Sequence, residues 1–536
     1  MEAKIDSIDE PSPCPTTEEL DQIWRWNAEV HESISACVHD KIAANKPDAL
    51  AVHAWDGDLT YAQLNAFADQ LAVRLISIGV APRSNIPLLF SKSKWACVGM
   101  LAVIKAGCAA VTLDANHPDA RLRSIVEQLQ PSLLVCSAGH QERALGLGVE
   151  EVVLIDENCF ETRGGLDDES PSLPKVSPTD IVYISFTSGT TGQPKGACVS
   201  HANVCSTVYY QGRKLGFNEQ SRVLDIAPYS FDVAWSNFMH TLCAGGCLCI
   251  AKEEDILNDL SSVIRQFQPT LINVTPTVLR TIQSPQPTLE TILLSGEMPY
   301  GDNITRWADQ VRLLNTYGPT ECTFKCAFSV LDATSADRPD LGVGVGFSTW
   351  IVSPNDASQL AAPGSVGELY LEGPMVGQGY LADAEKTSLS FIVDPPWLLA
   401  GSQNVPGRSG CVYKTGDLVK YLSDGRLLFV GRVQGGQLKI RGQRVELGDV
   451  EYYVRTCLGN ELAVIVDAIY PSDRDAASLA VFVETSGQDL QKIHDRLSNL
   501  QQKICEILPL FMIPSVFFPV NEFPVAATGK LDRKRL

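Results

Sequence analysis

The sequence predicts an α/β protein with more than one domain, and three observations support this prediction. The chain has 536 residues, which is too many for one ordinary hydrophobic core. Helical patterns alternate with short apolar strands from about residue 31 to 180, which favours helices packed on largely parallel sheets. From Gly367 the pattern changes to short strands, and a glycine-rich segment at 431–436 precedes about a hundred residues with helices and strands of their own.

Three elements of the N-terminal part have recognisable ends. The run LTYAQL, Leu59 to Leu64, begins a helix for which Thr60 is the expected N-cap. A second helix ends near Gly107, where glycine suits a C-cap, and it leads into a strand at 109–113. A third helix is expected at 237–246, where two glycines stop it.

Further apolar strands are expected at 181–184, 270–274, 291–294 and 311–314, and each is followed by a polar loop with glycine or proline. In open α/β sheets, ligands bind beyond the carboxyl ends of the strands. We therefore expect the loops that hold Phe231 and Asp232, residues 295–297 and residues 317–321 to converge on one site.

The C-terminal third has a different sequence pattern. Residues 367–373, GELYLEG, alternate with period two and predict a half-exposed antiparallel strand. Beyond the glycine-rich joint, helices and strands are expected over 446–457, 461–469, 479–484 and 491–508. These elements predict a small mobile α+β domain attached by a hinge.

Composition excludes several classes of function. A net charge of −20 and a pI near 4.9 argue against nucleic acid as a partner, because phosphate backbones need a basic surface. The most apolar run, 97–113, is broken by Lys105 and Gly107, so no membrane span is expected. The N-terminus lacks the apolar core of a signal peptide, and the sixteen cysteines are scattered among apolar residues. These features predict a cytoplasmic protein with reduced cysteines.

The segment from Phe186 to Gly196, FTSGTTGQPKG, is the strongest candidate for a ligand-binding loop. Its glycines allow close approach of the backbone, and its hydroxyls and Lys195 can bind phosphate oxygens. The alternative is a flexible surface turn, and composition alone does not separate the two. The segment is not a Walker A loop, because Pro194 precedes the lysine and Gly196 stands where a hydroxyl is needed.

Together, the motifs resemble those of nonribosomal peptide synthetase adenylation domains of the fungal type, which are adenylate-forming enzymes related to acyl-CoA synthetases and luciferases. The resemblance covers the chain from about residue 35. The matching segments are LTYAQL at 59–64, VIKAGCAAVTLD at 103–114, the loop at 186–196, Phe231-Asp232, NTYGPTE at 315–321, GELYLEGPMVGQGYL at 367–381, YKTGDL at 413–418, KIRGQRVELGDVE at 439–451, LPLFMIP at 508–514 and TGKLDR at 528–533.

The resemblance implies a large N-terminal core of two flanking α/β subdomains plus a small β-barrel-like subdomain, followed by a C-terminal lid. The implied boundaries are a leader or connector at 1–30 that docks through its tryptophans, the adenylation core at 31–433 and the lid at 434–536. The implied reaction joins a carboxylate to ATP with Mg²⁺, giving an acyl adenylate and pyrophosphate. Its transition state spreads charge over phosphate oxygens, so positioning and cations do most of the catalysis.

The resemblance also assigns roles to individual residues. Lys530 would reach from the lid to the substrate carboxylate, Thr320 would contact the α-phosphate, and Glu321 would hold Mg²⁺ as a hard oxygen ligand. Without the motif, each would pass for an ordinary surface residue. The expected nucleotide-binding residues are Thr187, Ser188, Gly189, Thr190, Thr191, Gly192, Lys195, Gly296, Asn315, Tyr317, Gly318, Asp417 and Arg432. Among them, Asp417 would accept the ribose hydroxyls and Tyr317 would stack on adenine.

Asp232 indicates the substrate class, because an aspartate at this motif position pairs with the α-ammonium group of an amino acid. Taken alone, it could equally be a helix N-cap. The implied pocket comprises Phe231, Asp232, Val233, Ser236, Asn273, Leu293, Ser295, Thr316, Phe324 and Lys325. Lys325 is unusual there: it could bind a carboxylate or a carbonyl oxygen, or it could turn out to solvent. The pocket favours a polar, acidic or hydrogen-bonding aromatic amino acid.

Two other interpretations stay open. One is a stand-alone acyl- or aryl-CoA ligase, and the other is a catalytically silent binding module on the same fold. An adenylation domain would pass its product to a phosphopantetheinylated carrier domain in cis or in trans, and no carrier motif occurs in the sequence, as expected for an excised domain. Gln434-Gly435-Gly436 replaces the aspartate that usually acts as the hinge, so the sequence assigns no hinge residue.

Overall fold

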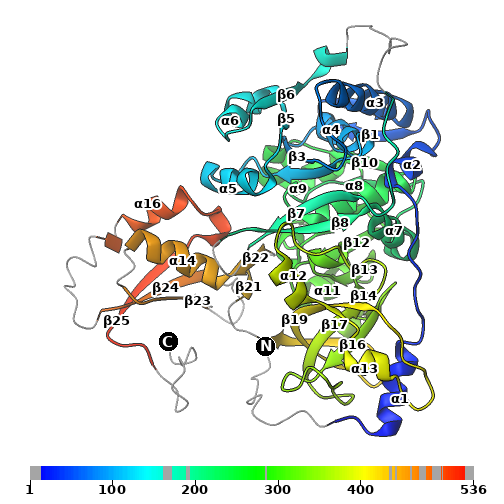
Figure 1. The fold of residues 1–536 in the computed structure, drawn as a ribbon, viewed down its shortest axis with the longest axis vertical. Coiled ribbons are helices and arrows are strands. Elements are labelled where there is room, and N and C mark those ends of the chain that lie inside the picture. The colour runs from blue at the N-terminus through cyan, green and yellow to red at the C-terminus, as the bar shows by residue number, and fades with distance from the viewer. Residues whose placement is uncertain are drawn as a thin grey trace.

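The structure of the chain is a computed structural model (Figure 1). It describes residues 14–160, 172–188, 193–283, 286–433, 437–440, 443–458, 462–469, 478–485, 496–497 and 499–524. Within these ranges, no helix combines the length and the apolar character that crossing a lipid bilayer requires.

A nine-stranded sheet forms one half of the N-terminal part. Its spatial order is β15-β14-β13-β12-β11-β9-β10-β1-β2, and the six strands from β13 to β1 run parallel. The strands are β1 (Leu50–Ala54), β2 (Gly57–Thr60), β9 (Arg222–Leu224), β10 (Cys247–Ile250), β11 (Leu271–Val274), β12 (Thr291–Ser295), β13 (Arg312–Tyr317), β14 (Ala327–Val330) and β15 (Val343–Gly344).

A six-stranded sheet forms the other half, with the order β6-β5-β3-β4-β7-β8. All of its pairs are parallel except β7 with β8. The strands are β3 (Asn85–Leu89), β4 (Ala109–Leu113), β5 (Leu133–Ser137), β6 (Glu151–Ile155), β7 (Ile181–Thr187) and β8 (Lys195–Ser200). The expected phosphate loop at 186–196 therefore includes the end of β7 and the start of β8, and its residues 189–192 lie outside the described ranges.

Helices cover the faces of both sheets. One hydrophobic core contains residues of both sheets together with α2 (Val38–Ala43), α3 (Tyr61–Ser77), α4 (Lys94–Lys105), α7 (His201–Leu215) and α8 (Asp232–Cys243). The nine-stranded sheet packs separately on α9 (Glu253–Phe267), α10 (Pro276–Leu279) and α11 (Gly301–Trp307), and the six-stranded sheet on α5 (Asp119–Leu129) and α6 (Gln141–Leu145). This arrangement confirms two flanking α/β layers. Short 3-10 turns lie at Ala138–His140, Glu157–Phe160, Thr320–Cys322, Ala333–Ser335 and Leu510–Met512.

Local sequence signals explain several helix ends. Thr60 caps α3 with its side chain in a reciprocal capping box with Gln63, and Gly107 adopts a φ of 72° after α4, as predicted. The helix predicted at 237–246 begins five residues earlier, at Asp232, because Phe231 takes an extended conformation and Asp232 enters the first turn. Phe231 occupies the N-cap position and Asp232 is the first residue of the helix, so the simple N-cap explanation for Asp232 is wrong.

An antiparallel five-stranded sheet follows in the chain. It consists of β16 (Ser348–Val352), β17 (Gly367–Glu372), β18 (Phe391–Val393), β19 (Cys411–Tyr421) and β20 (Leu427–Arg432), with α12 (Ala384–Ser390) and α13 (Pro396–Ala400) beside them. The predicted half-exposure of 367–373 is wrong, because every residue of β17 is buried. Its acidic positions find partners instead: Glu372 accepts from Arg408 at 2.7 Å and from Trp350 at 2.9 Å.

The N-terminal helix α1 (Thr17–Trp26) packs on this five-stranded sheet (Figure 1). Trp24 is fully buried, with its ring centroid 4.8 Å from that of Trp350. The ring of Trp26 lies 4.9 Å from that of Tyr421. The tryptophans therefore dock this segment, as the sequence predicts.

The C-terminal residues form a unit with a hydrophobic core of its own. It comprises β21 (Gln437–Ile440), β22 (Gln443–Glu446), α14 (Leu447–Leu458), β23 (Val464–Ile469), β24 (Ser478–Glu484), α16 (Leu500–Cys505) and β25 (Val516–Val520). Strands β23, β24 and β25 make a three-stranded sheet, and β21 pairs with β22. Much of the element expected at 491–508 lies outside the described residues.

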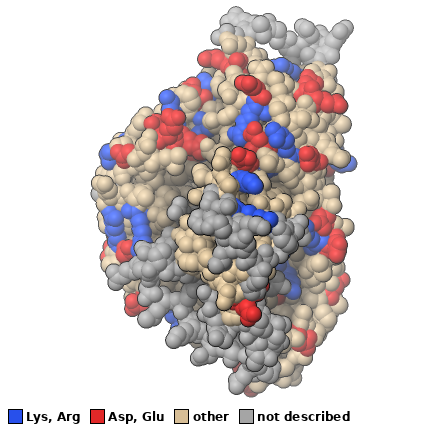
Figure 2. Space-filling model, turned by 90° about the vertical axis from the view of Figure 1, so that its left-hand side faces the viewer, with Lys and Arg blue, Asp and Glu red and all other residues tan. Residues whose placement is uncertain are grey.

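This unit lies against the six-stranded half of the molecule, beside α5 (Figure 1). Arg121 of α5 and Asp449 of α14 are both buried, and each charge acts on the pKa of the other. His117 and Phe511 are in ring contact at 6.3 Å. The described surface in Figure 2 carries Lys and Arg side chains among Asp and Glu side chains. Arg121 and Asp449, in contrast, are buried. The two buried charges therefore act on each other across the boundary between α5 and α14.

Burial raises the pKa of Asp449 from 3.8 to about 6, although the charge of Arg121 opposes this shift. Because the folded protein holds this proton more tightly than the unfolded chain, the contribution to stability is fully present below pH 3.8 and is lost as the pH rises through about 6. The difference corresponds to about 3 kcal/mol. We expect Asp449→Asn to remove this part of the pH dependence of urea unfolding between pH 4 and 8. Asp309→Asn, at an exposed position, is the control, and parallel curves for wild type and Asp449→Asn would contradict the expectation.

Candidate functional site

The segment after β13 carries five of the predicted site residues in a tight turn. A 3-10 turn spans Thr320–Cys322, and the chain then reverses through Thr323 and Phe324, whose φ angles are 53° and 76°. Gly318 lies against the returning backbone: a Cβ at this position would be 2.4 Å from the carbonyl oxygen of Phe324. A side chain at 318 would therefore displace the turn that positions Glu321 and Lys325.

Glu321 is the centre of a buried polar cluster. Its side chain is 0% exposed, and its Oε1 lies 3.4 Å from the Lys195 ammonium and accepts the Tyr380 hydroxyl at 2.7 Å. Lys195 also donates to the Tyr380 oxygen at 3.3 Å. Lys195 begins β8, Glu321 follows β13 and Tyr380 follows β17, so the cluster joins three sheets.

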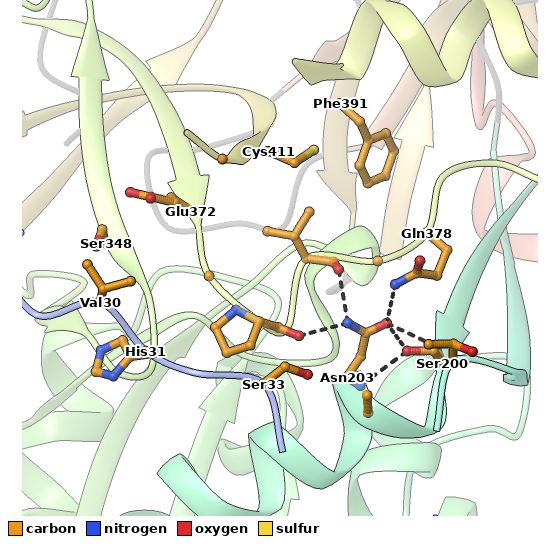
Figure 3. A pocket seen from close by; sticks show the side chains of 17 residues that line it. Val30, His31, Ser33, Ser200, Asn203, Ser348, Glu372, Gln378, Phe391 and Cys411 are labelled. Atoms are coloured by element: carbon orange, nitrogen blue, oxygen red, sulfur yellow. Dashed lines mark hydrogen bonds between the residues drawn. The ribbon is translucent and has the colours of Figure 1, made fainter. Parts of the chain in front are cut away.

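The loop that carries Tyr380 is fixed by backbone contacts. Gly377 N–H donates to the carbonyl of Glu321 at 2.8 Å, and a Cβ on Gly377 would lie 2.8 Å from that same oxygen. Gln378 N–H donates to the carbonyl of Cys198 on β8 at 2.8 Å. Asn203 of α7 donates to the carbonyls of Pro374 and Val376 (Figure 3). The glycine thus allows a close approach that brings Tyr380 to Glu321.

A cavity of about 520 Å³ lies on the other side of this loop segment, between the N-terminal connector and β17 (Figure 3). Its lining includes His31, Asn203, Glu372, Gln378 and Cys411. None of the predicted site residues within the described ranges lines it. We therefore place the candidate site at the Glu321 cluster and not in this cavity.

Asp417 forms a second polar centre close to β13. The Tyr317 hydroxyl donates to its Oδ2 at 2.5 Å, and Arg432 Nε donates to its Oδ1 at 2.6 Å. Tyr317 and Asp417 are buried, and burial together with the Asp417 charge raises the pKa of the Tyr317 hydroxyl. Asp417 therefore contacts both Tyr317 and Arg432, two other residues that are expected to bind the nucleotide.

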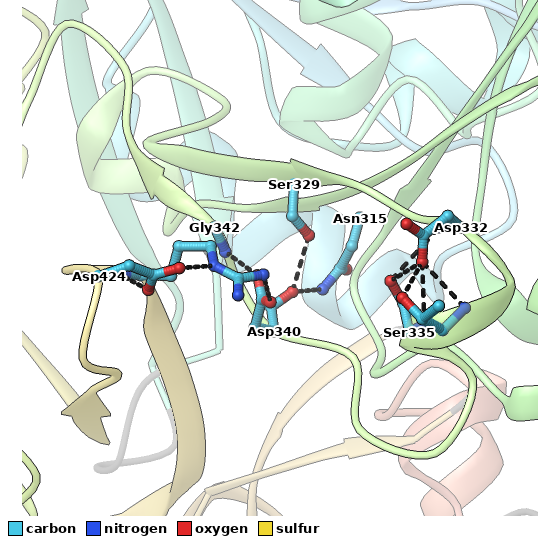
Figure 4. A network of polar contacts seen from close by, with 9 residues as sticks. Asn315, Ser329, Asp332, Ser335, Asp340, Gly342 and Asp424 are labelled. Atoms are coloured by element: carbon cyan, nitrogen blue, oxygen red, sulfur yellow. Dashed lines mark hydrogen bonds and ion pairs between the residues drawn. The ribbon is translucent and has the colours of Figure 1, made fainter.

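Asn315 lies on β13, and its amide points toward Asp340 (Figure 4). It donates to the carbonyl of Asp340 at 2.6 Å, which also accepts from Ser329 at 3.0 Å. The Asp340 carboxylate in turn binds Arg426 and the backbone N–H of Gly342. In this structure Asn315 anchors the 340–342 loop. Gly296, also predicted to bind nucleotide, has a φ of 89° directly after β12.

Asp232 meets the 320–325 turn from the start of α8. The residue is half-buried, and burial of its carboxyl raises its pKa. A hydrogen bond from Thr320 and the charge of Lys325 oppose this rise, while the charge of Glu321 adds to it. Asp232 is therefore a carboxyl whose pKa responds to both Glu321 and Lys325 of the predicted pocket.

Lys325 is buried, which excludes the alternative that it turns out to solvent in this structure. It is 2% exposed, and its ammonium donates to Ser236 Oγ at 3.2 Å. Burial lowers the pKa of Lys325 to about 8, although the charge of Asp232 raises it. His240 packs one turn after Ser236, and its Nδ1 lies 3.2 Å from Ser236 Oγ. Burial, followed by the Lys325 charge, lowers the pKa of His240 to about 3.

A chain of polar contacts connects the remaining pocket residues. Ser295 Oγ donates to Asn273 Oδ1 at 2.9 Å and lies 2.7 Å from Thr316 Oγ1. Asn273 donates to Asn237 Oδ1 at 3.4 Å. Leu293 and Phe324 are buried in the core shared by the two sheets, and Phe231 and Val233 are half-buried at the start of α8. The structure thus brings the predicted pocket residues together across β11, β12, β13 and α8.

Five predicted residues cannot be placed. Gly189, Thr190, Thr191, Gly192 and Lys530 lie outside the described residues. Thr187 and Ser188 are described at the end of β7, opposite the start of β8. The roles of the phosphate loop and of the C-terminal lysine stay predictions.

Two residues that contact predicted site residues, Tyr380 and His240, were not identified as site residues from the sequence. Tyr380 stands in the GELYLEGPMVGQGYL segment, so a signal was present, but nothing in the sequence pairs it with Glu321. His240 follows the predicted pocket residue Ser236 by one helical turn, so the two side chains share a helix face, and this spacing could have identified His240 from the sequence. Contacts that depend on three sheets meeting cannot be read from one segment.

The donor set fits the expected ligands. Mg²⁺ binds proteins through one or two carboxylates together with substrate phosphates, and Glu321 supplies a carboxylate beside the Lys195 ammonium. Asp417 is a carboxylate that already accepts a hydroxyl, from Tyr317, and it can accept ribose hydroxyls in the same way.

We expect Tyr380→Phe to destabilise the protein by about 1–3 kcal/mol, because the buried Glu321 carboxylate would lose its 2.7 Å hydrogen bond. The measurement is the free energy of urea unfolding. Tyr183→Phe is the matched control, since its buried hydroxyl has no hydrogen-bond partner among the described residues, and we expect an effect near zero. Equal effects of the two substitutions would show that the contact with Glu321 does not stabilise the fold.

Comparison with known proteins identifies the family. Residues 39–381 match the model of the AMP-binding enzyme family. A nonribosomal peptide synthetase of Aspergillus violaceofuscus is 44% identical over 536 residues, which cover 97% of this chain and 6% of that protein. The chain thus spans a small fraction of this relative's length.

Two solved structures share the fold. One contains the adenylation and PCP domains of a nonribosomal peptide synthetase protein, with a TM-score of 0.76, 24% identity, and coverage of 96% of this chain and 85% of that one. The other is a four-domain nonribosomal peptide synthetase bound to AMP and glycine, with a TM-score of 0.64, 25% identity, and coverage of 98% and 37%. The matched residues 39–381 include both large sheets and the Lys195–Glu321–Tyr380 cluster, and the chain belongs to the AMP-binding enzyme family.

Proposed function

We propose that this chain is an adenylation domain that activates the carboxylate of an α-amino acid with ATP and Mg²⁺. The product is an aminoacyl adenylate, and its destination is the phosphopantetheine thiol of a carrier domain in cis or in trans. The observation that carries the proposal is the position of Asp232, between the Glu321 cluster and the polar pocket. A carboxyl there suits the α-ammonium group of an amino acid.

In the proposed reaction, a substrate carboxylate oxygen attacks the α-phosphorus of ATP. The bond from this phosphorus to the bridging oxygen breaks, and pyrophosphate leaves with the electron pair. Mg²⁺ would neutralise phosphate charge, with Glu321 as its protein ligand. Lys195 lies 3.4 Å from Glu321, so its ammonium is suited to the phosphate oxygens at the same point. Lys530 would stabilise the attacking carboxylate from the lid.

The other proposed roles follow the contacts of the site. Thr320, which donates a hydrogen bond to Asp232, would contact the α-phosphate. Asp417, Tyr317 and Arg432 would hold the adenosine, which requires the present contacts of Asp417 to be shared with ribose hydroxyls. The expected phosphate loop would hold the leaving group through Thr187, Ser188, Gly189, Thr190, Thr191, Gly192 and Lys195.

The proposal includes the domain division at 1–30, 31–433 and 434–536. The separate hydrophobic core of the C-terminal unit supports it. The residues at 434–436, where the joint is expected, lie outside the described ranges. A cytoplasmic location also stays a prediction.

ATP–pyrophosphate exchange tests the function. We expect exchange with at least one α-amino acid, and we expect Lys530→Ala to lower its rate by about 100-fold or more, as loss of a group that stabilises transition-state charge does. Lys534→Ala, at a neighbouring lysine, is the control. Exchange driven only by an aryl or fatty acid without an amine would favour a CoA ligase, and ATP binding without exchange would favour a silent binding module.

A further inference from the structure

Lys325 is held as a buried cation at the base of the pocket. Its backbone N–H donates to the carbonyl of Thr323 at 3.1 Å, and its own carbonyl accepts from Gln211 Nε2 of α7 at 2.8 Å. Gln211 also donates to the carbonyl of Val345 at 2.9 Å. Because the backbone is fixed on both sides, the 2% exposed side chain cannot reach solvent without moving this turn.

Asp232 is the acidic residue whose charge acts on Lys325. Burial lowers the pKa of the lysine to about 8, and the carboxylate of Asp232 is the charge that raises it. The groups next to the ammonium add no negative charge: Ser236 is a hydroxyl, and His240 is neutral because burial and Lys325 lower its pKa to about 3. Glu321 has a cation of its own in Lys195. The pocket therefore holds one anion and one cation that depend on each other.

A bound amino acid changes this balance. In the proposed function, the α-ammonium group pairs with Asp232, so a second cation competes with Lys325 for the same carboxylate. A buried ion that loses its partner is strongly destabilised. Lys325 regains a negatively charged partner if the substrate carries a second carboxylate that reaches the lysine.

We infer that the amino acid activated here carries a carboxylate on its side chain, and that Lys325 binds this group. The inference rests on the proposed function and narrows its substrate class. An ammonium has three N–H donors, of which one goes to Ser236, and a carboxylate only accepts. The polar lining at Asn273, Ser295 and Thr316 is compatible with such a side chain.

The first test compares isosteric substrates on the wild-type protein. ATP–pyrophosphate exchange is measured with aspartate, asparagine, glutamate and glutamine, with glycine and leucine as references. Since a side-chain carboxylate can pair with the buried ammonium and the neutral amide cannot, we expect one acidic amino acid to exceed its amide by about 100-fold in kcat/KM. Equal rates for acid and amide, or preference for an uncharged side chain, would overturn the inference but leave the proposed function intact.

The second test removes the cation. Lys325→Met keeps an unbranched side chain without charge, and we expect it to lower kcat/KM for the acidic amino acid by about 100-fold while changing that for its amide by less than about tenfold. Lys46→Met is the matched control, because this lysine is 79% exposed and its loss changes the net charge equally. Similar losses for acid and amide would overturn the inference. If Lys325→Met does not fold, the wild-type acid-to-amide ratio decides alone, and no exchange with any amino acid would overturn both proposals.

Discussion

The ion pair between Lys195 and Glu321 is the contact on which the arrangement of the site depends. The lysine comes from the six-stranded sheet, the glutamate follows a central strand of the nine-stranded sheet, and Tyr380 completes the cluster from the five-stranded region. A buried carboxylate needs such partners, since an unpaired one is strongly disfavoured. The cluster therefore fixes three layers relative to one another, and the glycines at 318 and 377 allow the backbone approaches that it requires.

Two further groups of charged residues lie on either side of this contact. On one side, Asp417 is paired with Arg432 and Tyr317, an arrangement suited to a polar, hydroxyl-bearing ligand. On the other side, Asp232 and Lys325 share a region of low solvent access, where each alters the pKa of the other. Buried opposite charges contribute less to stability than to selectivity, because any ligand that takes one partner must compensate the other. In the proposed function, this constraint would connect the architecture of the site to the choice of amino acid.

The sequence predicted the fold well where a local signal and the tertiary packing agree. Thr60 caps its helix, Gly107 ends the next, and the strands at 109–113, 270–274 and 291–294 lie within about a residue of their expected ends. The strand expected at 181–184 starts at Ile181 but continues to Thr187. It was wrong where packing overrides periodicity. β17 alternates in polarity but is buried throughout, because Arg408, Trp350 and Lys414 supply partners to its glutamates. The helix at Asp232 also begins earlier than its apolar pattern indicates.

The sequence by itself determined the family and the set of residue types, because ordered motifs name the hydroxyls, carboxylates and lysines that phosphate and amino-acid chemistry needs. Only the tertiary structure decided which of them meet. It brought Tyr380 to Glu321, joined Asp417 to Arg432, and buried Lys325 against Ser236 when solvent exposure was an open alternative. The physical reason is that the Glu321 cluster and the contact of Lys325 with Ser236 join residues 59 to 185 positions apart, and no local pattern records how such segments pack.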